Sequence, residues 1–392
     1  MTRRTRFAIL GLVVAITVRV GGQTPASVPR TTTRDVVFTS HDVVFTSHDG
    51  HAMLGRLTLP DTPGVHPVLV FVQNAEASTL DQRLRNAKGE AVAFFDLYRE
   101  NLAPSNVGFF SYEGRGVHTD PTAPRAMRID ADVYNTSTLE NKVQDVVSAV
   151  CIVQKQAGVD ARKIMLRGVS EGTLIAAEAA ARIPSDIHAV VQSGMIGSTL
   201  QDMLKFMAAG GAFIQHRGHW DADNDGRISA AEYEADPKGV RRKSLPGVAF
   251  TVFDADRDGF YTEVDRDALS KPLVDAIAAG NIETTEGFLK LSATVPIPPG
   301  WVKDHFSHAS MWDFVSKLTM PVGVFQGEDD ANTPASGVRA LEARVKAAGK
   351  TNIEFTYFPG LGHGLGSTDY FTAGRLSTGY AAIFEFIARA VK

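Results

Sequence analysis

The sequence contains one cysteine, Cys151, in 392 residues, so no disulfide can form within the chain. Cys151 lies in the apolar helical pattern VVSAVCIVQ, which predicts a buried and unreactive thiol. An excess of basic residues is also absent, since 40 lysines and arginines stand against 44 aspartates and glutamates and the formal net charge is −4. This balance gives no sign of the basic surface that nucleic-acid binding requires, and no nucleic-acid partner is expected.

No apolar run at the N-terminus is long enough to span a membrane. The run from Phe7 to Val18 is shorter than the roughly 20 residues that a membrane-spanning helix needs. Arginines stand before it at positions 3, 4 and 6, and small residues follow it. This layout is typical of a secretory signal peptide, so residues 1–26 are predicted to be removed on export to the periplasm or beyond. A frayed terminus or a membrane anchor is the alternative; after cleavage no stable membrane anchor is expected.

Short apolar runs alternate with helical patterns along most of the chain. Such alternation predicts an α/β fold, a mostly parallel sheet with helices on both faces. A repeated heptad, DVVFTSH, leads through Asp49-Gly50 into an alternating run and predicts a hairpin. The helical patterns cover 89–102, 139–157, 171–182, 336–349 and 374–391. The apolar runs are PVLVFV (67–72), NVGFFSY (106–112), KIMLRG (163–168), HAVVQSG (188–194), PVGVFQG (321–327) and NIEFTYF (352–358).

This alternation is interrupted once. Between residues 197 and 310 the sequence predicts no sheet strand. The α/β core is therefore expected in two parts, 27–196 and 311–392, with a helical insert between them.

The pentapeptide Gly168-Val169-Ser170-Glu171-Gly172 matches G-x-S-x-G between an apolar strand and an alanine-rich helix. In that context the serine sits on a sharp turn, where side chains before and after it would not fit. A serine nucleophile needs a base, and a group that orients the base. Ligands bind at the carboxyl ends of strands in open α/β sheets, and there the sequence supplies Asp329, Asp330 and His363.

With these residues the chain resembles the α/β-hydrolase superfamily, above all its dienelactone-hydrolase-like and prolyl-oligopeptidase-like branches. The resemblance covers residues 40–392 apart from the insert. It implies a Ser-His-Asp triad of Ser170, His363 and Asp330, since family members usually read G-x-x-D at the acid turn. Asp329 is the alternative acid, and His305 and His308 are distant alternatives for the base. The resemblance rests on GVSEG (168–172), GEDD (327–330), GLGH (360–363) and YEGRGV (112–117).

The chain departs from this family at one loop. Such enzymes usually carry His-Gly after the strand that matches PVLVFV, and the next backbone N–H helps to form the oxyanion hole. This sequence has Gln73-Asn74-Ala75 there. A backbone donor does not depend on side-chain identity, so the resemblance still implies the N–H groups of Ala75 and Glu171 as oxyanion donors.

Two acidic loops in the insert, 221–232 and 254–265, match the EF-hand calcium loop. Both are predicted to bind structural Ca²⁺, and 254–265 more weakly, because an aspartate at position 12 reaches less far than a glutamate. Ile228 and Tyr261, each at position 8, predict a short strand pairing between the loops. Acidic turns that bind no metal are the alternative. The expected ligands are Asp221, Asp223, Asp225, Arg227 (by its carbonyl), Ser229 and Glu232, and Asp254, Asp256, Asp258, Phe260 (by its carbonyl), Thr262 and Asp265.

Together these patterns predict an exported serine hydrolase that cleaves a small carboxylic ester. The paired EF-hand insert stands where α/β-hydrolases commonly carry a cap over the active site. Alternatives are a peptidase or aminopeptidase of the same fold, acting on a short peptide, and a calcium-dependent binding protein on a catalytically silent hydrolase scaffold. A dockerin-like attachment module is disfavoured by the internal position of the loops.

Overall fold

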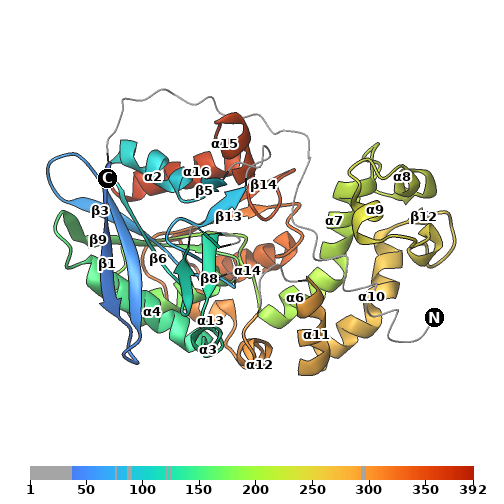
Figure 1. Ribbon diagram of the computed structural model, residues 1–392, viewed down its shortest axis with the longest axis horizontal. Helices are drawn as coiled ribbons and strands as arrows, with labels where there is room; N and C mark the ends of the chain where they lie inside the picture. The colour runs from blue at the N-terminus through green and yellow to red at the C-terminus, as the bar shows by residue number, and fades with distance from the viewer. Residues whose placement is uncertain (1–37, 76, 86–90, 121, 124–125, 293–296) are drawn as a thin grey trace.

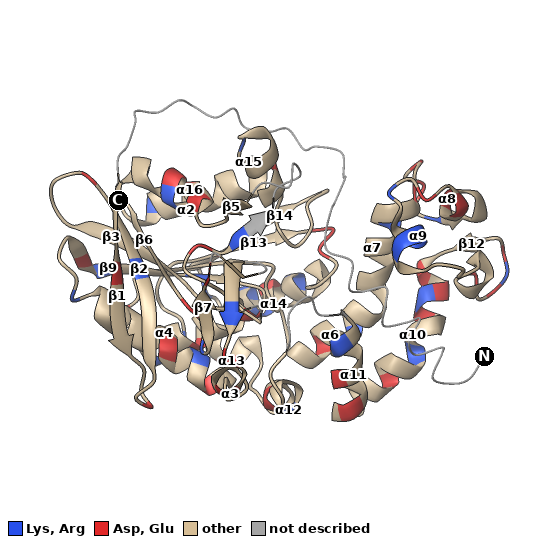
Figure 2. Ribbon diagram, in the orientation of Figure 1, with Lys and Arg blue, Asp and Glu red and all other residues tan. Residues whose placement is uncertain are grey.

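The computed structural model describes residues 38–75, 77–85, 91–120, 122–123, 126–292 and 297–392 (Figure 1). The predicted signal peptide lies outside these residues. None of the described helices combines the length and the apolar character that a membrane crossing requires. Figure 2 shows acidic and basic residues interspersed along the helices, strands and loops, in keeping with the near-balanced charge.

An eight-stranded sheet forms the centre of the molecule. Counted in spatial order from one edge, the first strand pairs antiparallel with the second, and the second pairs antiparallel with the third. All the later pairs are parallel. The six apolar runs are all strands of this sheet, and the repeated heptad enters the predicted hairpin, so the predicted α/β class is confirmed. In spatial order the strands are β1 (Phe38–Thr46), β2 (Ala52–Pro60), β6 (Gly108–Tyr112), β3 (His66–Phe71), β9 (Val159–Val169), β10 (Ala189–Ser193), β13 (Val322–Gly327) and β14 (Ile353–Phe358).

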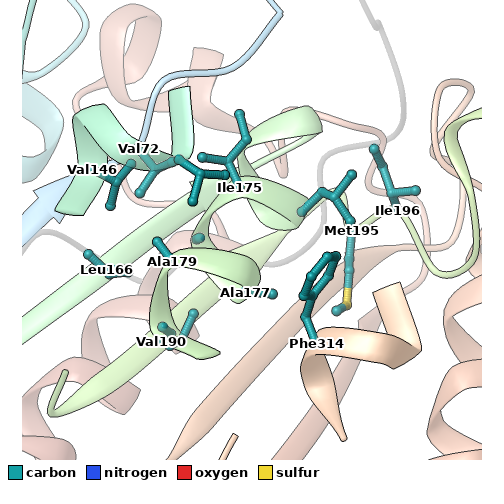
Figure 3. Close-up of a cluster of buried hydrophobic side chains, with 14 of the residues drawn as sticks. Val72, Val146, Leu166, Ile175, Ala177, Ala179, Val190, Met195, Ile196 and Phe314 are labelled. Carbon is teal, nitrogen blue, oxygen red and sulfur yellow. The ribbon is translucent and has the colours of Figure 1, made fainter. Parts of the chain in front are cut away.

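Helices cover both faces of the sheet because its central strands are apolar on both sides. In β3, Val68 and Val70 point into one core, and Leu69 and Phe71 point into the other. The first core is covered by α4 (Leu139–Val153), α5 (Glu171–Arg182), α13 (Met311–Val315) and α14 (Ala335–Ala347), and part of it is drawn in Figure 3. The second is covered by α2 (Asp96–Leu102) and α16 (Thr378–Ala390).

Two local predictions are wrong. The helical pattern at 89–102 becomes a helix only from Asp96, because Ala91–Ala93 (β5) pairs with Arg83–Arg85 (β4) and tertiary pairing outweighs helix propensity. Cys151 is exposed. It lies on α4 beside the buried Val150, and only one side of a surface helix faces the core, so an apolar sequence around a cysteine does not bury it.

The segment between β10 and β13 is helical, as predicted. Its first helix, α6 (Leu200–Ala208), belongs to the main core. The following part, α7 (Gly210–Trp220) to α10 (Glu263–Ala278), projects to one side of the sheet (Figure 1). From α7 to Tyr261 it packs around its own buried cluster, whereas Leu273 and Ile277 of α10 belong to the first core. This cluster consists of Phe213, Trp220, Ile228, Tyr233, Leu245, Phe250, Phe253 and Tyr261.

The two acidic loops lie in this projecting part and are joined by a short antiparallel pair. Ile228 in β11 (Ile228–Ser229) stands opposite Tyr261 in β12 (Phe260–Tyr261), as the sequence predicts. The other helices of the segment are α8 (Ala230–Ala235), α9 (Val240–Ser244), α11 (Ile282–Ser292) and α12 (Trp301–Phe306), with the 3-10 turn Phe250–Val252. Elsewhere the chain forms β7 (Val117–Thr119), β8 (Met127–Ile129), α3 (Ala131–Tyr134), α15 (Ser367–Ala373) and the 3-10 turn Ala103–Ser105.

Candidate active site

Ser170 stands at the turn between β9 and α5 in a conformation that side chains rarely adopt. Its φ is 56° and its ψ is −128°. Such backbone strain costs about 1–3 kcal/mol and persists only where the surroundings hold it. Here the N–H of Ser170 donates to the carbonyl of Ser193 at 3.1 Å, and its carbonyl accepts from the hydroxyl of Thr173 at 2.6 Å. The strained turn therefore presents the hydroxyl at the carboxyl edge of the sheet.

The two glycines of the pentapeptide allow this turn for different reasons. A Cβ on Gly168 would lie 2.6 Å from the carbonyl oxygen of Gly172, so a side chain there would collide with the first turn of α5. A Cβ on Gly172 would lie 3.1 Å from the carbonyl oxygens of Val72 and Gln73. Gly172 thus lets the loop after β3 pack against the turn that carries Ser170.

Asp330 lies directly after β13 and is 1% exposed. One carboxylate oxygen accepts from the N–H groups of Asn332 and Thr333 at 2.8 and 2.9 Å, and the other accepts from the Thr333 hydroxyl at 2.6 Å. Burial would raise the pKa of Asp330, but the charge and hydrogen bond of His363 and the bonds from Thr333 hold that pKa below its usual value. The carboxylate is therefore ionised at neutral pH.

His363 lies in the loop after β14, and its Nδ1 stands 2.8 Å from Oδ2 of Asp330. An ionised carboxylate can only accept, so Nδ1 carries the proton of this bond, and in the neutral ring Nε2 is then the nitrogen that can accept a proton. A Cβ on Gly194 would lie 2.7 Å from Cε1 of His363. Gly194 follows Ser193, whose carbonyl holds Ser170, so the ring lies beside the strand end that positions the serine.

The alternatives to these residues lie elsewhere. The side chain of Asp329 is exposed. His305 lies against the carboxylate of Glu171, and His308 lies 2.8 Å from that of Glu178. The structure therefore brings Asp330 and His363 together, as the family spacing implies, and leaves Asp329, His305 and His308 out of this pair.

The loop after β3 carries Gln73-Asn74-Ala75, the positions at which the chain departs from the family pattern. The Gln73 side-chain amide donates to the carbonyl of Tyr112, and the Lys142 ammonium donates to the carbonyl of Asn74 at 3.2 Å. Across from the loop, Glu171 begins α5, and the first N–H groups of a helix have no partner within it. A cleft beside the loop is lined by residues that include Asn74, Ala75 and Lys142.

Two buried polar residues support the site although the sequence analysis did not identify them. Gln326 accepts from the N–H of Met195 at 3.0 Å and donates to Asp330 Oδ2 at 3.0 Å, so it ties the acid to the end of β10. The guanidinium of Arg167 donates to the hydroxyl of Ser193 at 2.6 Å. Gln326 and Arg167 are each a polar residue within an otherwise apolar strand. This interruption of the apolar pattern is the sequence signal by which both could have been found.

In the insert, the two acidic loops share one hydrogen-bond pattern. The first aspartate accepts from the N–H of the glycine at position 6, and the residue at position 12 accepts from the N–H groups at positions 2 and 9. In 221–232 these bonds are Gly226 to Asp221 (3.1 Å), Ala222 to Glu232 (2.8 Å) and Ser229 to Glu232 (2.8 Å). In 254–265 they are Gly259 to Asp254 (3.1 Å), Ala255 to Asp265 (2.8 Å) and Thr262 to Asp265 (2.9 Å).

Each loop also contains a buried carboxylate oxygen with no hydrogen-bond partner among the described residues. These atoms are Oδ1 of Asp221 and Oδ1 of Asp254. The carboxylate oxygens of Asp254, Asp256 and Asp265 gather within 4.8 Å of one another, as do those of three aspartates in the other loop, Asp221, Asp223 and Asp225. A buried acceptor without a partner costs about 1–3 kcal/mol, and a cation among the gathered oxygens would offset that cost. Their chemistry fits Ca²⁺, which prefers carboxylate and carbonyl oxygens.

Comparison with known proteins finds no family model that matches the chain and no curated protein similar to it in sequence. Among solved structures, a thermostable carboxylesterase from a metagenomic library, EstE1, is 13% identical over all of this chain and 96% of its own, with a TM-score of 0.50. A Pyrococcus furiosus esterase is 13% identical, with 94% of this chain and 97% of its own covered and a TM-score of 0.49.

Dipeptidyl peptidase 4 of Porphyromonas gingivalis is also 13% identical, over 89% of this chain, with a TM-score of 0.46. This chain spans only 35% of that peptidase. At such identities the likeness concerns the fold alone, and the full-length match to EstE1 supports an α/β-hydrolase fold for the mixed sheet described above. The chain has the α/β-hydrolase fold.

Proposed function

We propose that the protein is a serine hydrolase with Ser170 as nucleophile, His363 as base and Asp330 as the acid that orients the base. The observation that carries this proposal is the hydrogen bond between His363 and a buried, fully satisfied Asp330, next to the strand end that holds the strained Ser170. Backbone strain at a polar residue is rarely kept without a function.

In this proposal Nε2 of His363 takes the proton of Ser170 as the hydroxyl oxygen attacks an acyl carbonyl. The N–H groups of Glu171 and Ala75 stabilise the negative charge on the carbonyl oxygen. His363 then gives the proton to the leaving group. Water hydrolyses the acyl-enzyme by the same steps in reverse, while Asp330 stabilises the imidazolium throughout.

The substrate that we propose is a small carboxylic ester. Esters react with serine nucleophiles more readily than amides do, because an alkoxide leaves more easily than an amine and needs less help from a positioned acid. The cleft beside Asn74 and Ala75 is lined by neither Ser170 nor His363, so the choice of an ester over a peptide rests on this difference in reactivity.

Labelling tests the proposal directly. Wild-type protein is treated with a fluorophosphonate probe, digested, and analysed by mass spectrometry for the modified peptide. We expect modification at Ser170 and turnover of nitrophenyl esters, with acetyl to octanoyl esters compared against aminoacyl anilides. Labelling without ester turnover but with anilide turnover would make the protein a peptidase. Absence of both would favour a silent scaffold.

We further propose that the loops 221–232 and 254–265 each bind a structural Ca²⁺ ion. The unpartnered, buried Oδ1 atoms of Asp221 and Asp254 support this, as does the shared hydrogen-bond pattern. The other protein ligands would be those predicted from the sequence in the two loops. Isothermal titration of chelator-treated protein with CaCl₂ tests the proposal, and two binding events are expected. No heat would mean that the loops are metal-free acidic turns.

Export is the third part of the proposal. Its support is the pattern of residues 1–26, arginines followed by an apolar run and small residues. N-terminal sequencing of the chain recovered from the exported fraction is expected to begin close to residue 27. A chain that keeps Met1 and stays in the cytoplasm would contradict this part.

A further inference from the structure

The carboxylate of Glu171, the residue after the proposed nucleophile, is an unusual group to find at this position. It is buried, at 2% exposed, although nothing in the proposed reaction uses it. Its Oε2 accepts from the ammonium of Lys142 at 2.8 Å, and its Oε1 accepts from the indole N–H of Trp301 at 2.8 Å. Nε2 of His305 lies 2.7 Å from Oε1.

Burial would raise the pKa of Glu171, but Lys142 and His305 lower it to about 2, so the group is ionised. A buried ion pair is a weak source of stability, because desolvation offsets most of its attraction. Stability alone therefore does not explain why a charge is kept directly behind Ser170. The geometry of Lys142 supplies a reason.

Lys142 is shared between the two sides of the proposed oxyanion hole. Its ammonium donates to Glu171, whose own N–H is one proposed donor to the oxyanion. It also donates to the carbonyl of Asn74 at 3.2 Å, and this carbonyl belongs to the same peptide unit as the N–H of Ala75, the other proposed donor. The Lys142 side chain is 12% exposed, so water competes little for these bonds.

A peptide unit is planar, and in the trans form its C=O and N–H point in opposite directions. A hydrogen bond that fixes the carbonyl of Asn74 therefore also fixes the direction of the N–H of Ala75. If the unit rotated, a carbonyl oxygen would face the oxyanion in place of a donor. The residue before this unit is held separately, by the bond from the Gln73 side chain to Tyr112 and by the close approach of Gly172.

We propose that Lys142 is a positioning residue that holds the Asn74–Ala75 peptide unit with its N–H directed at the oxyanion, and that Glu171 fixes Lys142 in that place. This inference rests on the proposed function. It also gives a role to the Gln-Asn-Ala loop, because the orientation that other family members obtain with their own loop sequence comes here from a cation on a neighbouring helix.

Changing Lys142 alone would leave the Glu171 carboxylate buried without its main partner, and Lys142→Met is therefore expected to be unstable. The test compares Glu171→Gln with the double variant Lys142→Met/Glu171→Gln, since both lack the Glu171 charge and they differ only at Lys142. Methionine keeps most of the length and volume of lysine. Lys350→Met is the matched control, because Lys350 donates to two backbone carbonyls, those of Ser316 and Leu318, before the amino ends of β13 and β14, and so at the opposite edge of the sheet from the proposed site.

We expect the double variant to lose about 10- to 100-fold in kcat relative to Glu171→Gln, somewhat less than the cost of deleting an oxyanion donor, which is about 10²–10³-fold. KM should change less than about threefold, and the rate of fluorophosphonate labelling should fall with kcat, since the probe's oxygen occupies the same hole. Lys350→Met should lower the melting temperature without changing kcat.

Wild-type kcat in both Glu171→Gln and the double variant would overturn the inference, because Lys142 would then serve only to neutralise Glu171. A fall in both kcat and melting temperature that Lys350→Met reproduces would overturn it as well. These results differ from a failure of the proposed function, in which wild-type protein neither labels at Ser170 nor hydrolyses any ester or anilide. That result would remove the basis of the inference too.

Discussion

The carboxylates of the core and those of the insert are satisfied in different ways. In the core, both oxygens of Asp330 accept hydrogen bonds, from Asn332, Thr333, Gln326 and His363. In the insert, the aspartates that begin the two acidic loops each leave one buried oxygen without a partner among the described residues. The acceptors of Asp330 are therefore satisfied within the fold, whereas each loop keeps one acceptor that the proposed Ca²⁺ would bind.

The same difference appears in packing. The core around Ser170 belongs to clusters that extend over both faces of the sheet. The acidic loops are supported by a separate cluster of eight residues, which includes Trp220 and Tyr261. A small cluster supplies less hydrophobic free energy, and the chain has no disulfide to supplement it. Changes to the core should thus alter the chemistry, and changes to the loops should alter stability.

The largest expected effect is that of Ser170→Ala. Turnover and fluorophosphonate labelling should both fall below detection, because no other nucleophile replaces the hydroxyl. The melting temperature should change little, since alanine meets the same strained φ of 56° as serine. Ser170→Gly is the matched control and should be at least as stable, because relief of about 1–3 kcal/mol of strain exceeds the added entropy cost of glycine. Retained activity in Ser170→Ala would contradict the assignment of the nucleophile.

Asp330→Asn should produce the next largest effect. By analogy with serine proteases, loss of the charge that orients the base costs about 10⁴-fold in kcat. The neighbouring Asp329 is exposed, so Asp329→Asn should cost less than about threefold. Steady-state kinetics with one nitrophenyl ester measures both. The reverse order of effects would show that the acid was assigned to the wrong aspartate.

Removal of calcium should destabilise the insert and leave the chemical step intact. If Ca²⁺ is present at about one hundred times its Kd, binding adds about 2.7 kcal/mol of stability. Chelation should therefore lower or broaden the thermal transition, and re-addition should restore it. Glu232→Gln should reproduce part of this loss, while Ser170→Ala should respond to calcium as wild type does. Melts that are identical with calcium and with chelator would mean that the loops add no stability through metal.

The pH dependence of Glu171 provides a smaller and calcium-independent effect. Its pKa is lowered from 4.5 to about 2 in the folded protein, so its ionisation stabilises the fold above about pH 4.5, and that contribution is lost as the pH falls toward 2. Between about pH 2 and 4.5, Glu171→Gln should reduce the slope of the free energy of unfolding against pH by up to about 1.4 kcal/mol per pH unit. Urea titrations at several pH values, all in chelator, measure the slope. Equal slopes in both proteins would mean that Lys142 does not stabilise the ionised form.

The sequence was sufficient for the features that depend on local pattern. Alternation of apolar strands and helices predicted the sheet, and the pairing of Ile228 with Tyr261 followed from loop position. It was not sufficient for features that depend on distant packing. The exposure of Cys151 follows from which side of α4 faces the sheet, and the bonds of Lys142 join residues 29 and 68 positions away in the chain. A lysine in an ordinary helical pattern gives no signal of such partners.

The smallest expected effect concerns the weaker of the two predicted calcium loops. Asp265→Glu lengthens the position-12 side chain of 254–265 by one methylene, which should favour bidentate binding and tighten the loop. The gain should be less than about tenfold in Kd, because Asp265 already accepts from Ala255 and Thr262 as Glu232 does from Ala222 and Ser229 in 221–232.

The matched change is Glu232→Asp, which shortens the corresponding side chain of 221–232. Asp265 reaches the other carboxylates of its loop, since its oxygen lies within 4.8 Å of those of Asp254 and Asp256. The group of gathered oxygens in 221–232 comes from three aspartates and does not include Glu232, although Glu232 accepts from the same backbone positions as Asp265 does. Glu232→Asp should therefore raise the Kd of 221–232 for Ca²⁺ by a larger factor than Asp265→Glu lowers the Kd of 254–265. Isothermal titration of the two variants measures this. The opposite result would be a gain in affinity in Asp265→Glu that exceeds the loss of affinity in Glu232→Asp. It would mean that the short side chain of Asp265 limits calcium binding in 254–265.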